Sequence, residues 1–120
     1  DEGPYRKHFL DLGGLGVRDL CPHGRDLLVL AGPSMDLDGP VRIYRWHGAA
    51  ETTGASKVAR GDELTPELEL PYGDGDDHAE GIAVLDEGPG TRVLVVYDSP
   101  SPERLTADGG VLADVVTLPE

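Results

Sequence analysis

The stretch P-Y-G-D-G-D-D-H-A-E-G-I-A-V-L-D, residues 71–86, joins an acidic, glycine-bearing loop directly to an apolar segment. Glycine and aspartate are common turn residues, and the apolar run of residues 82–85 is typical of a β-strand. The stretch separates two halves of the chain in which short apolar segments and turns follow one another in a similar order. It also contains the densest group of carboxylate and imidazole side chains. It therefore indicates both how the fold is organised and where a functional site would lie.

Both halves have the pattern of short strands separated by turns, with 17 Gly and 10 Pro in the chain and no sustained helical period. Segments with strand character are residues 8–12, 17–21, 27–32, 41–46 and 67–70 in the first half and 81–85, 92–98 and 111–118 in the second. Alternating polarity, as at 41–46, predicts one less buried face, whereas the unbroken apolar runs 27–31 and 93–96 predict strands covered on both faces. Residues 47–62 show no sustained period, so we expect a mobile loop there, or a turn of helix over 51–60.

The second half repeats the pattern of the first, with Val17 and Ile82 at matching places 65 residues apart. Propeller blades repeat at roughly 40–50 residues, and removing the 47–62 insertion brings the offset near that range. We therefore expect an all-β fold of the β-propeller type, a single fragment over residues 1–120 with about two four-stranded antiparallel units. The expected units cover residues 8–70 and 80–118.

Charge and cysteine content limit the classes of partner. The chain has 10 Lys and Arg against 23 Asp and Glu, and its net charge of −13 repels phosphate backbones and anionic lipid. Nucleic acid and membrane are therefore not expected as partners, whereas cations and basic proteins are favoured. The single cysteine, Cys21, cannot form an internal disulfide, and no apolar run approaches the roughly 20 residues of a membrane span. We expect a cytoplasmic protein.

Four carboxylates and a histidine lie within seven positions of the central stretch. They are Asp74, Asp76, Asp77, His78 and Glu80. Oxygen-rich loops with glycine suit hard ions such as Ca²⁺ or Mg²⁺, so these four carboxylates form a candidate metal site. Their spacing does not fit an EF-hand, which requires glycine and a bidentate glutamate at set positions. The alternative is a solvated acidic loop whose aspartates cap turns.

Glu80 adjoins the apolar run 82–85, where an unpaired carboxylate is costly to bury, so we expect it to meet a cation, an arginine or a channel water. Arg18 and Asp19 occupy nearly the same place in the first half. Residues entering the innermost strand of a propeller lie beside its central channel, the usual place for a site. The candidate ligand-binding residues are Arg18, Asp19, His78 and Glu80. The alternative is that Arg18 and Asp19 only tie neighbouring blades together.

Two further features indicate packing. Cys21 lies two residues from His23, but a cysteine in an apolar strand is usually an inert packed residue. Tyr44 and Trp46 share one face of a predicted strand, and we expect both to pack against the core.

Four runs of the sequence resemble a known family. They are G-L-G-V-R-D-L, L-V-L-A-G-P-S-M-D-L-D-G-P-V-R-I-Y-R-W, L-P-Y-G-D-G-D-D-H-A-E-G-I-A and L-V-V-Y-D-S-P. They are similar to the C-terminal part of an uncharacterised bacterial family, catalogued as domain of unknown function 3616, whose members are predicted to be β-propellers. The resemblance implies a fold and no activity, and because family members are longer, it also implies that further blades exist. The run H-A-E-G-I-A is similar to the Glu-Gly strand openings of calcium-dependent propeller phosphatases and lactonases.

The residues leave open whether the protein is an enzyme. One hypothesis is a propeller-type ligand-binding or assembly module with a divalent-cation site near Glu80. The other is a calcium-dependent hydrolase of phosphoesters or lactones, with Glu80 and Asp77 as ligands and His78 as general base. Because two blades are too few to close a ring, we expect either a homo-oligomer or a partner chain that supplies further blades.

Overall fold

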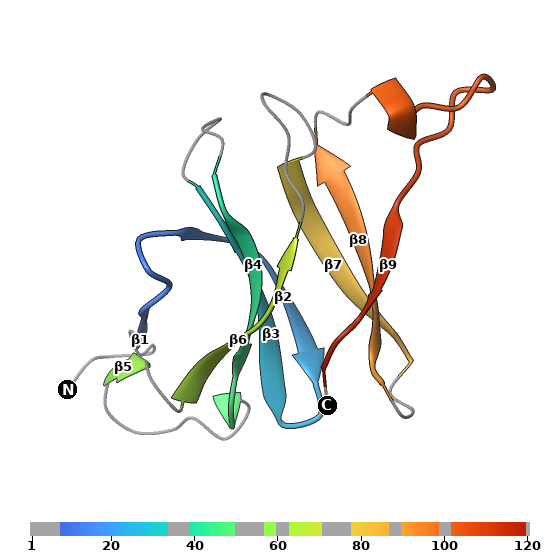
Figure 1. The fold of residues 1–120 in the computed structure, drawn as a ribbon. Helices are drawn as coiled ribbons and strands as arrows, with labels where there is room; N and C mark the ends of the chain where they lie inside the picture. The colour runs from blue at the N-terminus through green and yellow to red at the C-terminus, as the bar shows by residue number, and fades with distance from the viewer. Residues whose placement is uncertain are drawn as a thin grey trace, which may run out of the picture.

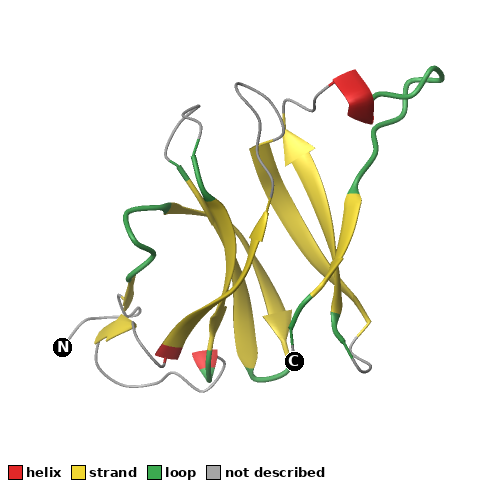
Figure 2. Ribbon diagram, viewed as in Figure 1, coloured by secondary structure: helices red, strands yellow, loops and turns green. Residues whose placement is uncertain are grey.

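The fold is mostly antiparallel β-sheet, as seen in a computed structural model that describes residues 8–33, 39–49, 57–59, 63–70, 78–86, 90–98 and 102–119 (Figure 1). The strands are β1 (His8–Leu10), β2 (Gly16–His23), β3 (Asp26–Gly32), β4 (Val41–Trp46), β5 (Lys57–Ala59), β6 (Leu64–Leu70), β7 (His78–Asp86), β8 (Arg92–Asp98) and β9 (Asp114–Thr117). A short 3-10 helix, η3, covers Pro102–Arg104 (Figure 2). The prediction of an all-β protein is confirmed. Within the described ranges, no helix has the length and apolarity needed to cross a membrane.

Strands β2, β3, β4 and β6 form a four-stranded antiparallel sheet in that order, which we name sheet one. The turn between β2 and β3 is tight, because His23 is already paired with Asp26. Gly24 lies in this turn with a φ of 61°, a left-handed conformation that favours glycine. The two strands predicted at residues 17–21 and 27–32 therefore form a hairpin, and both extend further toward the turn than their apolar runs indicated.

Strands β7, β8 and β9 form a three-stranded antiparallel sheet, sheet two. Four strands were expected in this unit, so the expectation is wrong for the described residues. The last predicted strand, residues 111–118, is also too long, since β9 begins only at Asp114 and Val111 makes an isolated bridge with Leu105.

A third element, unexpected from the sequence, is the parallel pair of β1 and β5. It aligns His8–Leu10 with Lys57–Ala59. Part of the segment expected to be a mobile loop or a turn of helix is therefore a strand. Residues 50–56 and 60–62 of that segment lie outside the described residues.

Two hydrophobic clusters form the core. The larger lies between the sheets and contains Leu28, Leu30, Val41, Ile43 and Leu70 of sheet one and Ala79, Ile82, Val93, Val95, Tyr97 and Leu118 of the second unit. The smaller covers the opposite face of sheet one and contains Leu12, Val29, Ala31, Tyr44 and Leu64, with Leu10, Leu15 and Trp46 packed against it. Sheet one is therefore covered on both faces, and the prediction that Tyr44 and Trp46 pack against the core is confirmed.

Strands β3 and β8 differ in how well they are covered. Every residue of β3 from Leu28 to Gly32 is buried. In β8, Val93 and Val95 are buried between the sheets, whereas Val96 is 45% exposed. Coverage on both faces, predicted for both strands, is confirmed for β3 and wrong for β8.

The registers show which residues of the two sheets are equivalent. The pairing of β2 with β3 shifts between Val17 and Asp19, and that of β7 with β8 shifts between Ala79 and Gly81. The bulged residues are thus Arg18 and Glu80, 62 positions apart. Equivalent residues of the two sheets are therefore 62 positions apart and not 65, as predicted from the sequence, because the bulges and not the apolar runs define which residues are equivalent.

Candidate functional site

The two bulges meet where β2 and β7 run side by side. Arg18 Nη1 forms an ion pair with Glu80 Oε1, and the Arg18 side chain is 12% exposed while that of Glu80 is 41% exposed. Arg18 Nη2 donates to the carbonyl oxygen of Pro33. Gly32 allows this path, since a Cβ there would lie 2.5 Å from Arg18 Nε. Of the three partners expected for Glu80, the structure provides the arginine.

Asp19 makes a second tie between the sheets. Its Oδ2 accepts a hydrogen bond of 2.8 Å from the backbone N–H of Ile82 on β7. The Ile82 N–H lies on the edge of β7 that does not pair with β8, so Asp19 supplies the acceptor that this donor needs. Arg18 and Asp19 therefore do join neighbouring sheets, as the structural alternative expected. Ligand binding by this set stays a prediction.

His78 and the acidic loop complete the predicted site residues. His78 begins β7 and is only 7% exposed, which argues against a general base that meets substrate from solvent. Asp74, Asp76 and Asp77 lie outside the described residues. In the described ranges, no three His, Cys, Asp or Glu side chains are grouped so that they could hold a metal ion. The Ca²⁺ or Mg²⁺ site and the hydrolase therefore stay predictions.

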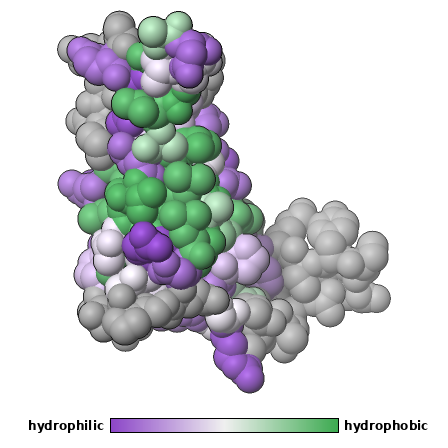
Figure 3. All heavy atoms as spheres, turned by 90° about the vertical axis from the view of Figure 1, so that its right-hand side faces the viewer, coloured by the Kyte–Doolittle hydropathy of each residue, from purple (hydrophilic) through white to green (hydrophobic). Residues whose placement is uncertain are grey.

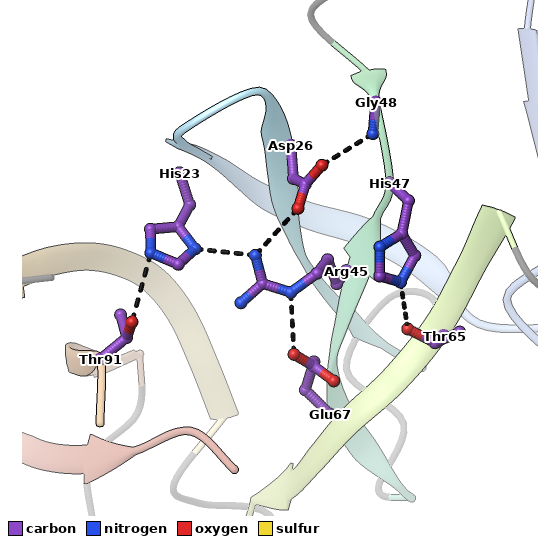
Figure 4. A network of polar contacts seen from close by, with 8 residues as sticks. All are labelled: His23, Asp26, Arg45, His47, Gly48, Thr65, Glu67 and Thr91. Carbon is purple, nitrogen blue, oxygen red and sulfur yellow. Dashed lines mark hydrogen bonds and ion pairs between the residues drawn. The ribbon is translucent and has the colours of Figure 1, made fainter. Parts of the chain in front are cut away.

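A polar network not predicted from the sequence lies at the other end of β2 (Figure 4). Arg45 donates from Nε to Glu67 at 2.9 Å and from Nη1 to Asp26 at 3.1 Å, and its side chain is largely buried. Arg45 Nη1 also lies 2.8 Å from His23 Nδ1. Because a guanidinium only donates, His23 accepts through Nδ1, and its Nε2–H donates to Thr91 Oγ1 at 3.2 Å. The network thus ties the β2–β3 turn of sheet one to the start of β8.

The charges of this network stabilise one another. Burial raises the pKa of Asp26, but a 2.7 Å hydrogen bond from the Gly48 N–H and the neighbouring Arg45 lower it, and the net pKa lies below the ordinary value. Burial lowers the pKa of Arg45, but Glu67 and Asp26 raise it above the ordinary value. Asp26 and Arg45 are therefore both charged near neutral pH, and the network is structural in character. The sequence shows only that β4 carries two arginines and β6 two glutamates. Which of them meet is set by the register of the two strands, in which Arg45 lies opposite Thr65.

Cys21 has no catalytic setting. It packs against the cluster between the sheets and its Sγ contacts the carbonyl oxygen of Pro22 at 3.6 Å. The interpretation of a packed cysteine agrees with this environment.

A second charged cluster fixes the start of β9. Arg104 donates from both terminal nitrogens to the Asp114 carboxylate at 3.0 Å, and the Tyr97 hydroxyl donates to the same carboxylate at 2.6 Å. These hydrogen bonds, that of Arg104 first, lower the pKa of Asp114. The guanidinium also stacks 3.8 Å from the centre of the Tyr97 ring. Asp114 is therefore satisfied within sheet two.

An open groove of about 460 Å³ borders β4 and β6. It is lined by Arg42, Tyr44, Pro66, Glu67, Leu68 and Glu69. Its charged groups are already paired, since Arg42 Nε donates to Glu69 at 2.8 Å and Glu67 accepts from Arg45. The groove therefore presents no cluster of converging polar groups that would orient a ligand.

The side of sheet two that faces away from sheet one is apolar. Ala83, Leu94 and Val115 lie opposite one another across β7, β8 and β9, and Val96 follows Leu94 on the same face. We name these four residues the outer face. On this side of the molecule, hydrophobic side chains form a continuous band (Figure 3). A hollow of about 150 Å³ opens beside it, lined by Asp19, Gly81, Ile82, Ala83, Leu94 and Val96.

Comparison with known proteins identifies a family and no activity. No curated protein and no solved structure matches this chain. The sequence profile of a family described as "Protein of unknown function (DUF3616)" matches residues 1–114. This match confirms the resemblance to that family noted in the sequence motifs. The chain therefore belongs to the DUF3616 family of proteins of unknown function.

Proposed function

We propose that this protein is an assembly module whose outer face binds a further antiparallel β-sheet. The observation that carries the proposal is the equivalence of the two sheets. Cys21 and Ala83 each lie three residues beyond the bulge of their strand, and they pair with Leu28 and Leu94 respectively. Leu28 and Leu94 thus occupy the same place on the same face of their sheets. One is completely buried by the neighbouring sheet, and the other faces away from it.

The next residue on each face follows the same rule. Leu30 of β3 is completely buried, while its equivalent on β8, Val96, is 45% exposed. The opposite sides of the two strands also correspond, through the equivalent residues Val29 and Val95. Val29 faces away from sheet two, and Val95 faces sheet one. The two sheets therefore stack in the same sense, like successive blades of a propeller. A further sheet on the outer face would continue this stack.

In the purified protein, we propose that the further sheet comes from a second copy of the chain. The back of sheet one, represented by Val29, Ala31 and Tyr44, is already closed by Leu12 and its neighbours. On that back face, Val17 and Leu20 of the edge strand β2 stay exposed, whereas on the outer face no described segment covers the middle of the sheet, around Leu94 and Val96. A face of this kind can pair with itself about a two-fold axis, because a head-to-tail ring needs two complementary faces. Such a dimer covers the outer face of both copies, although it does not continue the stack in the same sense.

Footprinting of the full chain with a carbene reagent tests this function at residue level. As protein concentration rises, labelling of Leu94, Val96 and Val115 should fall. Labelling of Val17 and Leu20, which are exposed apolar residues of β2, should not change. Constant labelling of the outer face up to about 1 mM, a concentration that detects even weak association, would contradict the proposal.

A further inference from the structure

We infer that the free edge of β9 accepts an extended, uncharged strand from a partner, running antiparallel to β9. This surface adjoins the outer face and shares Val115 with it, but strand addition uses backbone groups at an edge and not side chains on a face. The argument comes from a comparison of strand order, backbone geometry and charge between the two sheets.

Strand order identifies the position. Leu28 pairs with Arg45 on β4, and its equivalent Leu94 pairs with Val115 on β9, so β9 stands in sheet two where β4 stands in sheet one. The other edge of β4 pairs with the seven-residue strand β6. In the described part of the chain, β9 is the last strand of its sheet. Among the described residues, sheet two therefore has no counterpart of β6.

The backbone of β9 makes this edge receptive. In an antiparallel strand, alternate residues direct both N–H and C=O away from the neighbouring strand. At an edge these groups are available to another chain. One apolar side chain of β9, Val115, is also exposed, at 52%. An extended segment could thus add backbone hydrogen bonds and cover apolar surface together.

Charge decides the kind of strand that fits. In sheet one, Arg45 of β4 pairs with Glu67 of β6 at 2.9 Å. At the equivalent place β9 has Val115, so an incoming glutamate would find no cation there. The charged group of β9 itself, Asp114, is already held by Arg104 and Tyr97, so this pair offers no new partner to an acidic strand. The edge therefore favours a neutral sequence, unlike the acidic strand that completes sheet one.

The test uses two synthetic peptides and a charge-swapped protein. One peptide has the β6 sequence L-T-P-E-L-E-L, and the other replaces both glutamates by threonine, with the same short solubilising tail on each. Amide exchange of β9 in the full chain is followed by NMR for the wild type and for Val115→Arg, whose folding is checked from its spectrum. The wild type should bind the neutral peptide at least about threefold more tightly, as expected for one exposed charge pair.

The charge swap separates edge binding from non-specific contact. Val115→Arg restores the arginine that β4 carries, so it should reverse the preference in favour of the glutamate peptide. Protection of β9 amides by neither peptide, or the same preference in both proteins, would overturn the inference. So would binding that leaves the β9 amides unprotected. The proposed assembly through the outer face is not affected by any of these results, because it is measured without peptide.

Discussion

Sheet one and sheet two are built on the same pattern but differ in completeness. Both have a first strand with a bulge at the same place, followed by two antiparallel neighbours. Sheet one has a fourth strand and apolar clusters on both faces, whereas sheet two has three described strands and an apolar cluster only on the face toward sheet one. Equivalent residues therefore experience different environments.

This difference shows how interface residues can be recognised without a bound partner. A solitary exposed valine on a protein surface carries little information. Val96 is informative because its equivalent, Leu30, is a completely buried interface residue in the same molecule. Comparing an exposed residue with its equivalent in the other sheet thus shows whether it occupies an interface position, which its exposure alone does not.

The largest expected effect is the contrast between Leu28→Ala and Leu94→Ala. Leu28→Ala removes a completely buried side chain and should lower the free energy of unfolding by about 2–5 kcal/mol. Leu94→Ala should cost about 1 kcal/mol or less, because its side chain is only partly covered. Denaturant unfolding at low protein concentration measures both. Equal losses would mean that the two faces are covered alike.

The next effect concerns the hydrogen bond that joins the sheets. Asp19→Ala removes the acceptor of the Ile82 N–H and should destabilise the protein by about 1–3 kcal/mol. Asp19→Asn keeps a carbonyl oxygen at the same place and should cost clearly less. If the two variants were equally stable, the hydrogen bond would not be what matters at this position.

Acid should weaken both sheets through their paired aspartates. The hydrogen bond from Arg104 lowers the pKa of Asp114, and Gly48 and Arg45 lower that of Asp26 despite its burial. A carboxyl with a depressed folded-state pKa contributes its full stability above the unfolded-state value of about 3.9, and this contribution is lost as pH falls through the folded-state pKa. Unfolding free energies measured from neutral pH downward should therefore fall below about pH 4.5. In Asp114→Asn and Asp26→Asn this fall should be smaller, and an unchanged fall in both would refute the assignment.

The smallest expected effect concerns Ca²⁺ and Glu80. Arg18 already pairs with Glu80, so Glu80→Gln should cost no more than about 1 kcal/mol at this partly exposed position. Any melting shift caused by Ca²⁺ should be the same in the wild type and in this variant. A Ca²⁺ shift that disappears with Glu80→Gln would instead make Glu80 a metal ligand.

Local sequence patterns were sufficient for much of the fold. Alternation in residues 41–46 placed Ile43 and Tyr44 on opposite faces, and they belong to the two separate clusters. The similarity of the two halves also placed Arg18 and Glu80 at nearly the same position, although the predicted offset of 65 was not that of the bulges. These inferences succeeded because periodicity and repeats depend on neighbours in sequence.

Features set by non-local pairing were not predictable in the same way. The β1–β5 pair joins segments from opposite ends of the first half. Residues 8–12 were expected to be a strand, but Lys57–Ala59 is too short to show a period, and the pairing itself leaves no local signal. The Arg45 network depends on the register of β4 with β6 and on Thr91 from the second half. That sheet two has three strands in the described residues could not be predicted from residues 111–118, whose apolar run continues beyond both ends of β9.

Sedimentation velocity of the full chain gives the most direct test of assembly through the outer face. Val96→Lys introduces a charge on that face, and Val17→Lys is a matched control, because Val17 is 49% exposed on β2 and lies outside the outer face. The wild type and Val17→Lys should shift from monomer to dimer as concentration rises toward about 1 mM, while Val96→Lys should stay monomeric. A wild type that remains monomeric throughout, or a Val96→Lys variant that dimerises like the wild type, would contradict the account.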